Sequence, residues 1–271
     1  MKVEIKADFD EAIRCNIDLP QRVVVVIDWM IPTNVHPVPD DTVVFWVTTQ
    51  PEGDYNKIIQ DHPECYTYLL TMFPELLKLP NAHYFMGCTS FVEPDPNIKK
   101  EFGVSTVMSG RRNLPGHALR WEFFDRQGEV TVPLDYYLGT HNALPEPLYE
   151  RGIRLSAEKR DKITAFNRMF HVTFASFRRW GFFSEKIIDC FITKTIPIFW
   201  GCINIGDYFN TASIIQVEDV SNAIDICNLL TEDVYYDRMH SVEDNYKRGL
   251  EYYSYEYQLE KTIKRILDED S

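Results

Sequence analysis

The chain has 271 residues, 45% of them apolar, which is enough material to bury the cores of two α/β domains. Its formal net charge of -13 opposes non-specific binding to a phosphate backbone or an anionic membrane, so we expect no nucleic-acid partner. The absence of an apolar leader, and of any apolar run near the roughly 20 residues that span a bilayer, predicts a cytoplasmic protein (in the host cytoplasm if viral) with no membrane span.

Apolar runs of strand length alternate with helical patterns in the first hundred residues. Runs at 23–27 and 43–47, rich in valine and aromatic residues, predict two buried strands joined by a proline-rich loop. The spacing of apolar residues over 63–79 predicts a helix, and 83–86 a short strand after it. We therefore expect a small N-terminal domain over residues 1–102.

A second series of elements begins at Val104 and defines an expected C-terminal domain over residues 103–271. The expected strands are 104–108, 130–132, 171–174, 195–200 and 213–217, and the expected helices are 120–128, 221–230, 232–253 and 255–267. This alternation predicts an α/β fold with mainly parallel sheets covered on both faces. The last helix is counted with this domain, with packing back on the N-terminal domain as the alternative.

The segment from Gly181 to Ile192 is the most informative part of the chain. Ser184 is a good N-cap, and the apolar residues after it lie on one helical face, so Glu185 and Lys186 fall in the first turn. A helix start offers free amide N–H groups and a positive dipole end, which suits a phosphate. Lys186 adds a full charge, and Glu185 is suited to accept hydrogen bonds from sugar hydroxyls. Considered alone, this dipeptide is more often a solvated surface pair.

Three segments in a fixed order resemble the donor-binding core of the family 10 fucosyltransferases. They are residues 184–189 (SEKIID), 195–201 (TIPIFWG) and 207–210 (DYFN). A weaker likeness extends to exostosin-like glycosyltransferases. The resemblance implies a GT-B architecture, two Rossmann-like domains facing across a cleft. The C-terminal domain would hold a nucleoside-diphosphate sugar, and the N-terminal domain would bind the acceptor. It also implies inverting transfer without an essential metal or other cofactor.

A second cationic segment, residues 109–120, leaves one predicted strand and enters a helix. Such a loop can hold a diphosphate through backbone amides and arginines. Arg120 best matches the arginine that the family places before an aromatic helix, and Arg111 is a weaker candidate, although loop arginines are mostly exposed and structural. The resulting set of candidate donor-binding residues is Ser109, Arg111, Arg120, Phe182, Ser184, Glu185, Lys186 and Asn210.

Two departures from the family pattern bear on the donor. Phe182 stands where members usually have a tyrosine, and Ala175-Ser176 stands where they usually have a Glu-Asn pair. Both lie beside the expected sugar pocket. GDP-fucose is the favoured donor, a UDP-sugar such as UDP-xylose is the alternative, and a catalytically inactive glycan-binding module is an interpretation of another class. The expected acceptor is a glycan or glycoprotein.

Inverting transfer needs a carboxylate that removes the proton of the acceptor hydroxyl. The family places a glutamate in the N-terminal domain, after a strand ending in an aromatic pair, which here points to Glu52, with Asp54 in reserve. Asp28 is a third candidate, because it follows the predicted strand 23–27 and would lie at an edge of the sheet that faces the cleft. Because the chain has 41 acidic residues, the competing interpretation of each is a surface carboxylate. No histidine is assigned as a base, and His117 is expected at most to line the pocket.

No metal site is expected. The six cysteines, at positions 15, 65, 88, 190, 202 and 227, show no close pairing, which argues against a zinc site or a disulfide framework. The Asp-x-Asp motif at residues 8–10 lies near a terminus and is better explained as a solvated turn.

Overall fold

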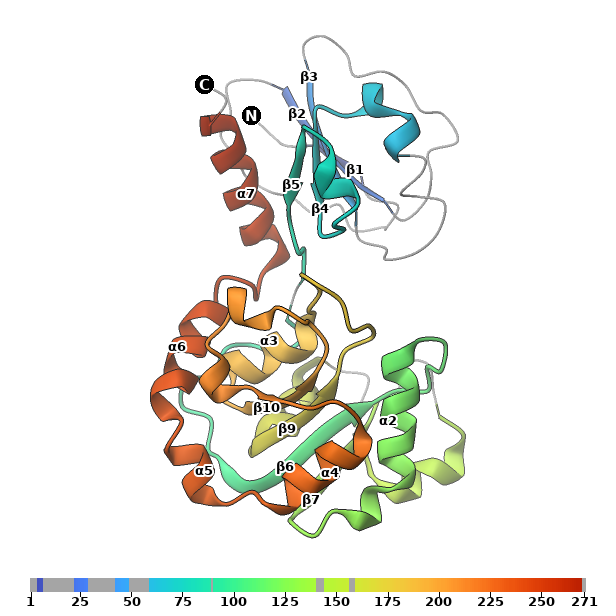
Figure 1. The fold of residues 1–271 in the computed structure, drawn as a ribbon, viewed down its shortest axis with the longest axis vertical. Helices are drawn as coiled ribbons and strands as arrows, with labels where there is room; N and C mark the ends of the chain where they lie inside the picture. The colour runs from blue at the N-terminus through green and yellow to red at the C-terminus, as the bar shows by residue number, and fades with distance from the viewer. Residues whose placement is uncertain are drawn as a thin grey trace. The chain divides into compact units, whose positions relative to one another are not determined.

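The computed structural model describes residues 4–6, 22–28, 42–48, 59–88, 90–139, 144–155 and 159–269. These fall into two compact units (Figure 1). The first contains the described residues up to Gly87 together with those from Tyr255 onward, and the second runs from Cys88 to Ser254. The chain thus passes into its second unit before residue 102, the expected boundary, and returns to the first unit at its end.

The first unit contains a parallel sheet whose strands lie side by side in chain order. Its strands are β1 (Glu4–Lys6), β2 (Arg22–Asp28), β3 (Thr42–Thr48), β4 (Tyr68–Thr71) and β5 (Ala82–Tyr84). Helix α7 (Tyr255–Glu269) packs on this sheet through Leu259, Ile263 and Ile266, which recur at helical spacing and are fully buried against Val25 and Phe45. The last helix therefore contributes to the core of the first unit.

The helix predicted over residues 63–79 is wrong. Two short 3₁₀ helices, η1 (Pro63–Cys65) and η2 (Leu76–Lys78), flank strand β4 there. Leu69 and Leu70 are both fully buried, because β4 is an inner strand with neighbours on both sides. A strand buried on both faces is an unbroken apolar run, and such a short run does not distinguish strand from helix by its period.

The second unit is built on a six-stranded parallel sheet with the strand order β11-β10-β9-β6-β7-β8. Its strands are β6 (Glu101–Met108), β7 (Leu134–Leu138), β8 (Ile153–Arg154), β9 (Arg168–Phe174), β10 (Ile196–Trp200) and β11 (Ile215–Gln216). The chain starts in the middle, builds outward through β7 and β8, and returns to place β9 on the other side of β6. This is the order of dinucleotide-binding folds, and its reversal between β6 and β9 is the topological switch point.

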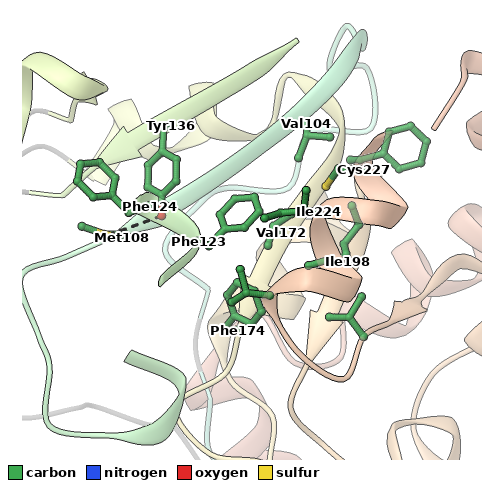
Figure 2. Close-up of a cluster of buried hydrophobic side chains, with 14 of the residues drawn as sticks. Val104, Met108, Phe123, Phe124, Tyr136, Val172, Phe174, Ile198, Ile224 and Cys227 are labelled. Carbon is green, nitrogen blue, oxygen red and sulfur yellow. Dashed lines mark hydrogen bonds between the residues drawn. The ribbon is translucent and has the colours of Figure 1, made fainter. Parts of the chain in front are cut away.

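Helices cover both faces of this second sheet. They are α2 (Pro115–Asp125), α3 (Glu185–Ile192), α4 (Val220–Asn228), α5 (Glu232–Tyr236) and α6 (Met239–Gly249), with 3₁₀ helices η3 (Gln127–Glu129), η4 (Glu146–Arg151), η5 (Lys159–Phe166), η6 (Ile205–Asp207) and η7 (Thr211–Ser213). Figure 2 shows the core on one face, where Phe123 of α2 and Ile224 of α4 meet the strand residues Val172 and Phe174.

The opposite face of the sheet carries polar groups. Strand residues alternate between faces, so Ser105 and His171 point away from the core of Figure 2. The Ser105 hydroxyl lies 2.8 Å from His171 Nδ1 and also donates to the carbonyl of Ala165 in η5. The η5 segment therefore packs on this second face, where α3 also contacts β9 and β10.

Two further expectations for the second unit are corrected. The predicted strand 130–132 is absent, and β7 begins only at Leu134, because Pro133 has no N–H for a ladder and contributes only its carbonyl, which accepts from Val104 N at 2.8 Å. The helix predicted over 232–253 is two helices, α5 and α6.

Candidate functional site

The two candidate donor-binding segments meet at one edge of the second sheet. Strand β6 ends at Met108 and is followed by the loop with Ser109 and Arg111, while β9 ends at Phe174 and is followed by the loop with Phe182. Since β6 and β9 are parallel neighbours, their carboxyl ends lie side by side. In open parallel sheets, ligands bind at this edge, at the switch point.

The start of α2 is packed directly on the end of β9. Gly116 N donates to the carbonyl of Ser176 at 3.1 Å. A Cβ atom at Gly116 would lie 1.6 Å from the carbonyl oxygen of Ala175, so only glycine fits in this first helical turn. The close approach fixes where the next turn of α2 places its side chains.

Arg120 lies one turn further along α2 and is only 8% exposed. Its Nε and Nη2 atoms donate to the carbonyl oxygen of Phe174, at 2.8 and 2.5 Å. Burial lowers the pKa of the guanidinium to about 10, and the nearby carboxylate of Glu185 opposes that shift. Arg120 therefore remains a cation at neutral pH, held at the carboxyl end of β9 with only two of its five N–H donors on this carbonyl.

The expected helix start after Ser184 is confirmed. Ser184 has an extended backbone, with φ of -143°, and its side chain accepts from Lys186 N, which makes it the N-cap of α3. The carboxylate of Glu185 and the ammonium of Lys186 form an ion pair in the first turn, with side chains 19% and 29% exposed. The pair is thus neither a solvated surface pair nor fully buried, and a ligand can reach it.

The charges of this first turn are set by several neighbours. Burial raises the pKa of Glu185, but the fields of Lys186 and Lys162 outweigh burial and, with Arg120, lower it to about 2. Burial lowers the pKa of Lys186, while Glu185 opposes that shift. At neutral pH, Glu185 is a carboxylate that only accepts hydrogen bonds.

The pKa of His117 is affected by the same cations. It is buried in α2, and its Nδ1 lies 3.1 Å from Asn113 Oδ1. Burial lowers its pKa to about 4, and the cations of Arg120, Lys186 and Arg111 add to the shift. His117 is therefore neutral at pH 7, and these three cations, from α2, α3 and the loop before α2, act on one place. Such a cluster suits a diphosphate.

Two charged residues in this field had no role assigned from the sequence. Lys162, in η5, was not identified at all, and Asp189 was noted only as part of the motif. Lys162 Nζ lies 2.5 Å from Asp189 Oδ2. The sequence did contain one indication for Asp189. It stands four residues after Glu185, which puts both carboxylates on one face of α3.

Other candidates lie in different surroundings. Asn210 caps η7: its Oδ1 accepts from Ala212 N at 3.1 Å, and its Nδ2 donates to Asp244 at 3.2 Å. Its backbone N and O are both bonded to the Asn245 side chain of α6, so the observed contacts of Asn210 are structural. Phe182 is half-buried, with its ring edge-to-face to Phe177 at 5.9 Å. Glu52 and Asp54, and the side chain of Asp28, lie outside the described residues.

The described residues contain neither a metal-binding cluster nor a helix that could cross a membrane. No group of three or more His, Cys, Asp or Glu side chains there is arranged to hold a metal ion. In the same part of the chain, every helix is too short or too polar to cross a bilayer.

Comparison with known proteins relates the chain to glycosyltransferases. The alpha-(1,3)-fucosyltransferase FucT of Helicobacter pylori is 31% identical over 110 residues, which are 38% of this chain and 23% of that protein. A crystal structure of an alpha1,3-fucosyltransferase with GDP matches with a TM-score of 0.51 at 16% identity, over 87% of this chain and 77% of the other. The crystal structure of TarM matches with a TM-score of 0.57 at 10% identity, over 90% and 54%. No family model matches the chain.

The chain has a fucosyltransferase-like GT-B fold. The GT-B fold accounts for the two α/β units, and among the described strands only those of the second unit have the order of a dinucleotide-binding sheet. The chain spans about a quarter of the length of its Helicobacter pylori relative, so the likeness is to a part of that protein.

Proposed function

We propose that this GT-B chain is a glycosyltransferase that binds a nucleoside-diphosphate sugar beside β6 and β9 and transfers the sugar, with inversion and without a metal, to a hydroxyl of a glycan or glycoprotein. The observation that carries the proposal is the convergence of Arg120, Lys186 and the first turn of α3 on the switch point of the sheet. Cations and helix N–H groups at that edge are the groups that bind a diphosphate in α/β folds.

The two cations act on the leaving group. As the bond from the sugar to the diphosphate breaks, negative charge grows on the diphosphate, and fixed cations stabilise it more than the ground state. Arg120 is already fixed by its two bonds to Phe174. Lys186 is paired with Glu185 and reaches the diphosphate by leaving that partner, which frees the Glu185 carboxylate to accept hydrogen bonds from hydroxyls of the donor.

GDP-fucose is the donor that we favour. The support is the likeness of segments 184–189, 195–201 and 207–210 to fucosyltransferases, together with neighbours of the same fold whose structures contain GDP and GDP-fucose. Phe182 lacks the hydroxyl that a tyrosine would offer beside the sugar, so a UDP-sugar stays the alternative. Glu52 stays the proposed base with Asp54 in reserve, and a cytoplasmic location stays a prediction from the sequence.

Isothermal titration of the purified chain with GDP and with UDP tests the proposal. We expect GDP to bind and UDP not to bind, whereas binding of UDP alone would favour the UDP-sugar donor. Binding of neither nucleotide would contradict the proposal. Binding without hydrolysis or transfer of any nucleotide sugar would identify an inactive glycan-binding module.

Variants connect that binding to the site. Lys186→Ala and Arg120→Ala each remove one charge-assisted contact to the diphosphate, so we expect the affinity for GDP to fall roughly 10- to 100-fold. Arg126→Ala is the matched control, because this arginine is at the end of α2 but pairs with the exposed residues Glu122 and Glu129. Equal GDP affinity in all three folded variants would show that the nucleotide binds elsewhere.

A further inference from the structure

Trp121 of α2 makes two contacts with the loop that precedes its own helix. Its indole Nε1 donates to the carbonyl oxygen of Arg111 at 3.0 Å. The guanidinium carbon of Arg112 lies 3.4 Å from the centre of the Trp121 ring. Because an indole has a single N–H donor and no acceptor, the carbonyl of Arg111 takes its whole hydrogen-bonding capacity. One side chain thus holds two consecutive residues of the loop.

The loop over residues 109–114 is attached to α2 at a third residue as well. Asn113 Oδ1 lies 3.1 Å from Nδ1 of His117 in α2. The helix is itself anchored to the end of β9 by the backbone bond of Gly116 and by the guanidinium of Arg120. The loop is therefore tied to a helix whose place at the edge of the sheet is fixed.

The Trp121 side chain is a rigid support for this loop. It is only 8% exposed, and its ring packs edge-to-face on Phe124, with 6.0 Å between the ring centres. A large ring fixed by packing has few alternative positions. If the ring turned away, it would give up its burial, its bond to Arg111 and its contact with Arg112 together.

The two neighbouring arginines are held in different ways. Arg112 is held by its side chain, because its guanidinium stacks on the indole ring, an attraction between a cation and the face of the ring. Arg111 is held by its backbone carbonyl, and its side chain is exposed three residues after Met108, where β6 ends beside β9. A fixed carbonyl sets the direction in which the side chain of Arg111 leaves the backbone. Of the two, Arg111 is the one suited to contact a diphosphate at the switch point.

We infer that Trp121 is a positioning residue, which holds the loop over residues 109–114 in the conformation in which Arg111 contacts the diphosphate. The inference rests on the proposed function and adds to it a residue that touches the loop rather than the ligand. Without the indole N–H, the loop samples more conformations, and ordering them on binding costs affinity. The loss therefore reaches the ligand through Arg111.

A double-mutant cycle tests whether Trp121 acts through Arg111. Trp121→Phe keeps an aromatic ring and removes the N–H that bonds to Arg111, so we expect GDP to bind about three- to tenfold more weakly in titration calorimetry. Arg111→Ala should weaken binding about tenfold, and Trp121→Phe should then add less than about twofold in the Arg111→Ala background. A residue that only stabilises the fold would weaken binding by the same factor in both backgrounds.

Two further variants serve as controls. Tyr235→Phe also removes one donor to a backbone carbonyl, the bond of 2.8 Å to Lys194 O, but Lys194 precedes β10 and so lies at the opposite edge of the sheet. Its GDP affinity should stay within about twofold of that of the unsubstituted chain. Arg112→Ala removes the charge next to Arg111 and should weaken GDP binding less than Arg111→Ala does. This last comparison does not depend on the folding of Trp121→Phe.

Limited proteolysis measures the loop without any ligand. Trypsin cleaves after Arg111 and Arg112, which are both exposed, at a rate that follows the local opening of the loop. We expect cleavage at these two sites, identified by fragment mass, to be about three- to tenfold faster in Trp121→Phe than in the unsubstituted chain. Cleavage after Arg265 in α7 is the internal reference and should keep its rate.

The outcomes distinguish this inference from the proposed function. If GDP binds and Trp121→Phe costs the same factor with and without Arg111, the inference is wrong and the proposed function stands. The same holds if Arg112→Ala weakens binding more than Arg111→Ala, or if Trp121→Phe leaves the cleavage rate of the loop unchanged. If GDP does not bind to the unsubstituted chain, the proposed function fails and the inference fails with it.

Discussion

Gly116→Ala probes the contact that positions the candidate site, the packing of α2 on the end of β9. The new Cβ would lie 1.6 Å from Ala175 O and 2.7 Å from Ala175 C, both of them backbone atoms that cannot rotate away. The start of α2 must therefore move by more than an ångström. That movement breaks the bond from Gly116 N to Ser176 O and carries Arg120 away from Phe174.

The cost has two parts. Overpacking at a tight site costs about 1–3 kcal/mol, and the lost backbone bond adds about 1 kcal/mol. We expect the free energy of unfolding to fall by about 2–4 kcal/mol. Because Arg120 moves with the helix, we also expect the folded variant to bind GDP about tenfold more weakly.

Urea unfolding followed by circular dichroism measures the stability, and titration calorimetry measures the affinity. Gly128→Ala is the matched control, since a Cβ there meets nothing within 4 Å. Its free energy of unfolding should stay within about 0.5 kcal/mol of that of the unsubstituted chain. If Gly116→Ala unfolded at the same urea concentration as Gly128→Ala, the close approach of α2 to β9 would be refuted.

Two further expectations concern the stability of the second unit. His171 is buried, and burial together with the fields of Lys162 and Lys100 lowers its pKa to about 3. Below pH 6.5 the unfolded chain binds a proton at His171 that the folded chain does not. The free energy of unfolding should therefore decrease as the pH is lowered, with a slope from this residue approaching 1.4 kcal/mol per pH unit. Urea unfolding of His171→Gln between pH 6.5 and 5 should show a slope smaller by about that amount, and an unchanged slope would contradict the assignment. Asn245→Ala leaves the backbone N and O of Asn210 unpaired, so we expect a loss of about 2–4 kcal/mol in urea unfolding. The comparison is the half-buried Asn222→Ala, which loses a single bond from Glu218 N and should cost about 1 kcal/mol or less. Equal losses would show that the Asn245 contacts contribute little.

The local chemistry of the site was predictable from the sequence. Ser184 followed by an apolar face predicted the start of α3 and its N-cap, because capping and helical periodicity involve residues within one or two turns of each other. The alternation of strands and helices likewise predicted a parallel α/β fold. At β4, however, the apolar pattern predicted a helix, because a strand buried on both faces shows no alternation of apolar and polar residues.

The tertiary structure decided which of these local features meet. Arg120 and Lys186 act on one place only because β6 and β9 are neighbours, and that strand order depends on how the whole second unit packs. Lys162 lies at the site because η5 crosses the face of the sheet that carries Ser105 and His171. No short sequence pattern predicts this position, because Lys162 and Asp189 are far apart in the chain. Their ion pair matters only in the folded protein, where the buried carboxylate of Asp189 needs a counter-charge.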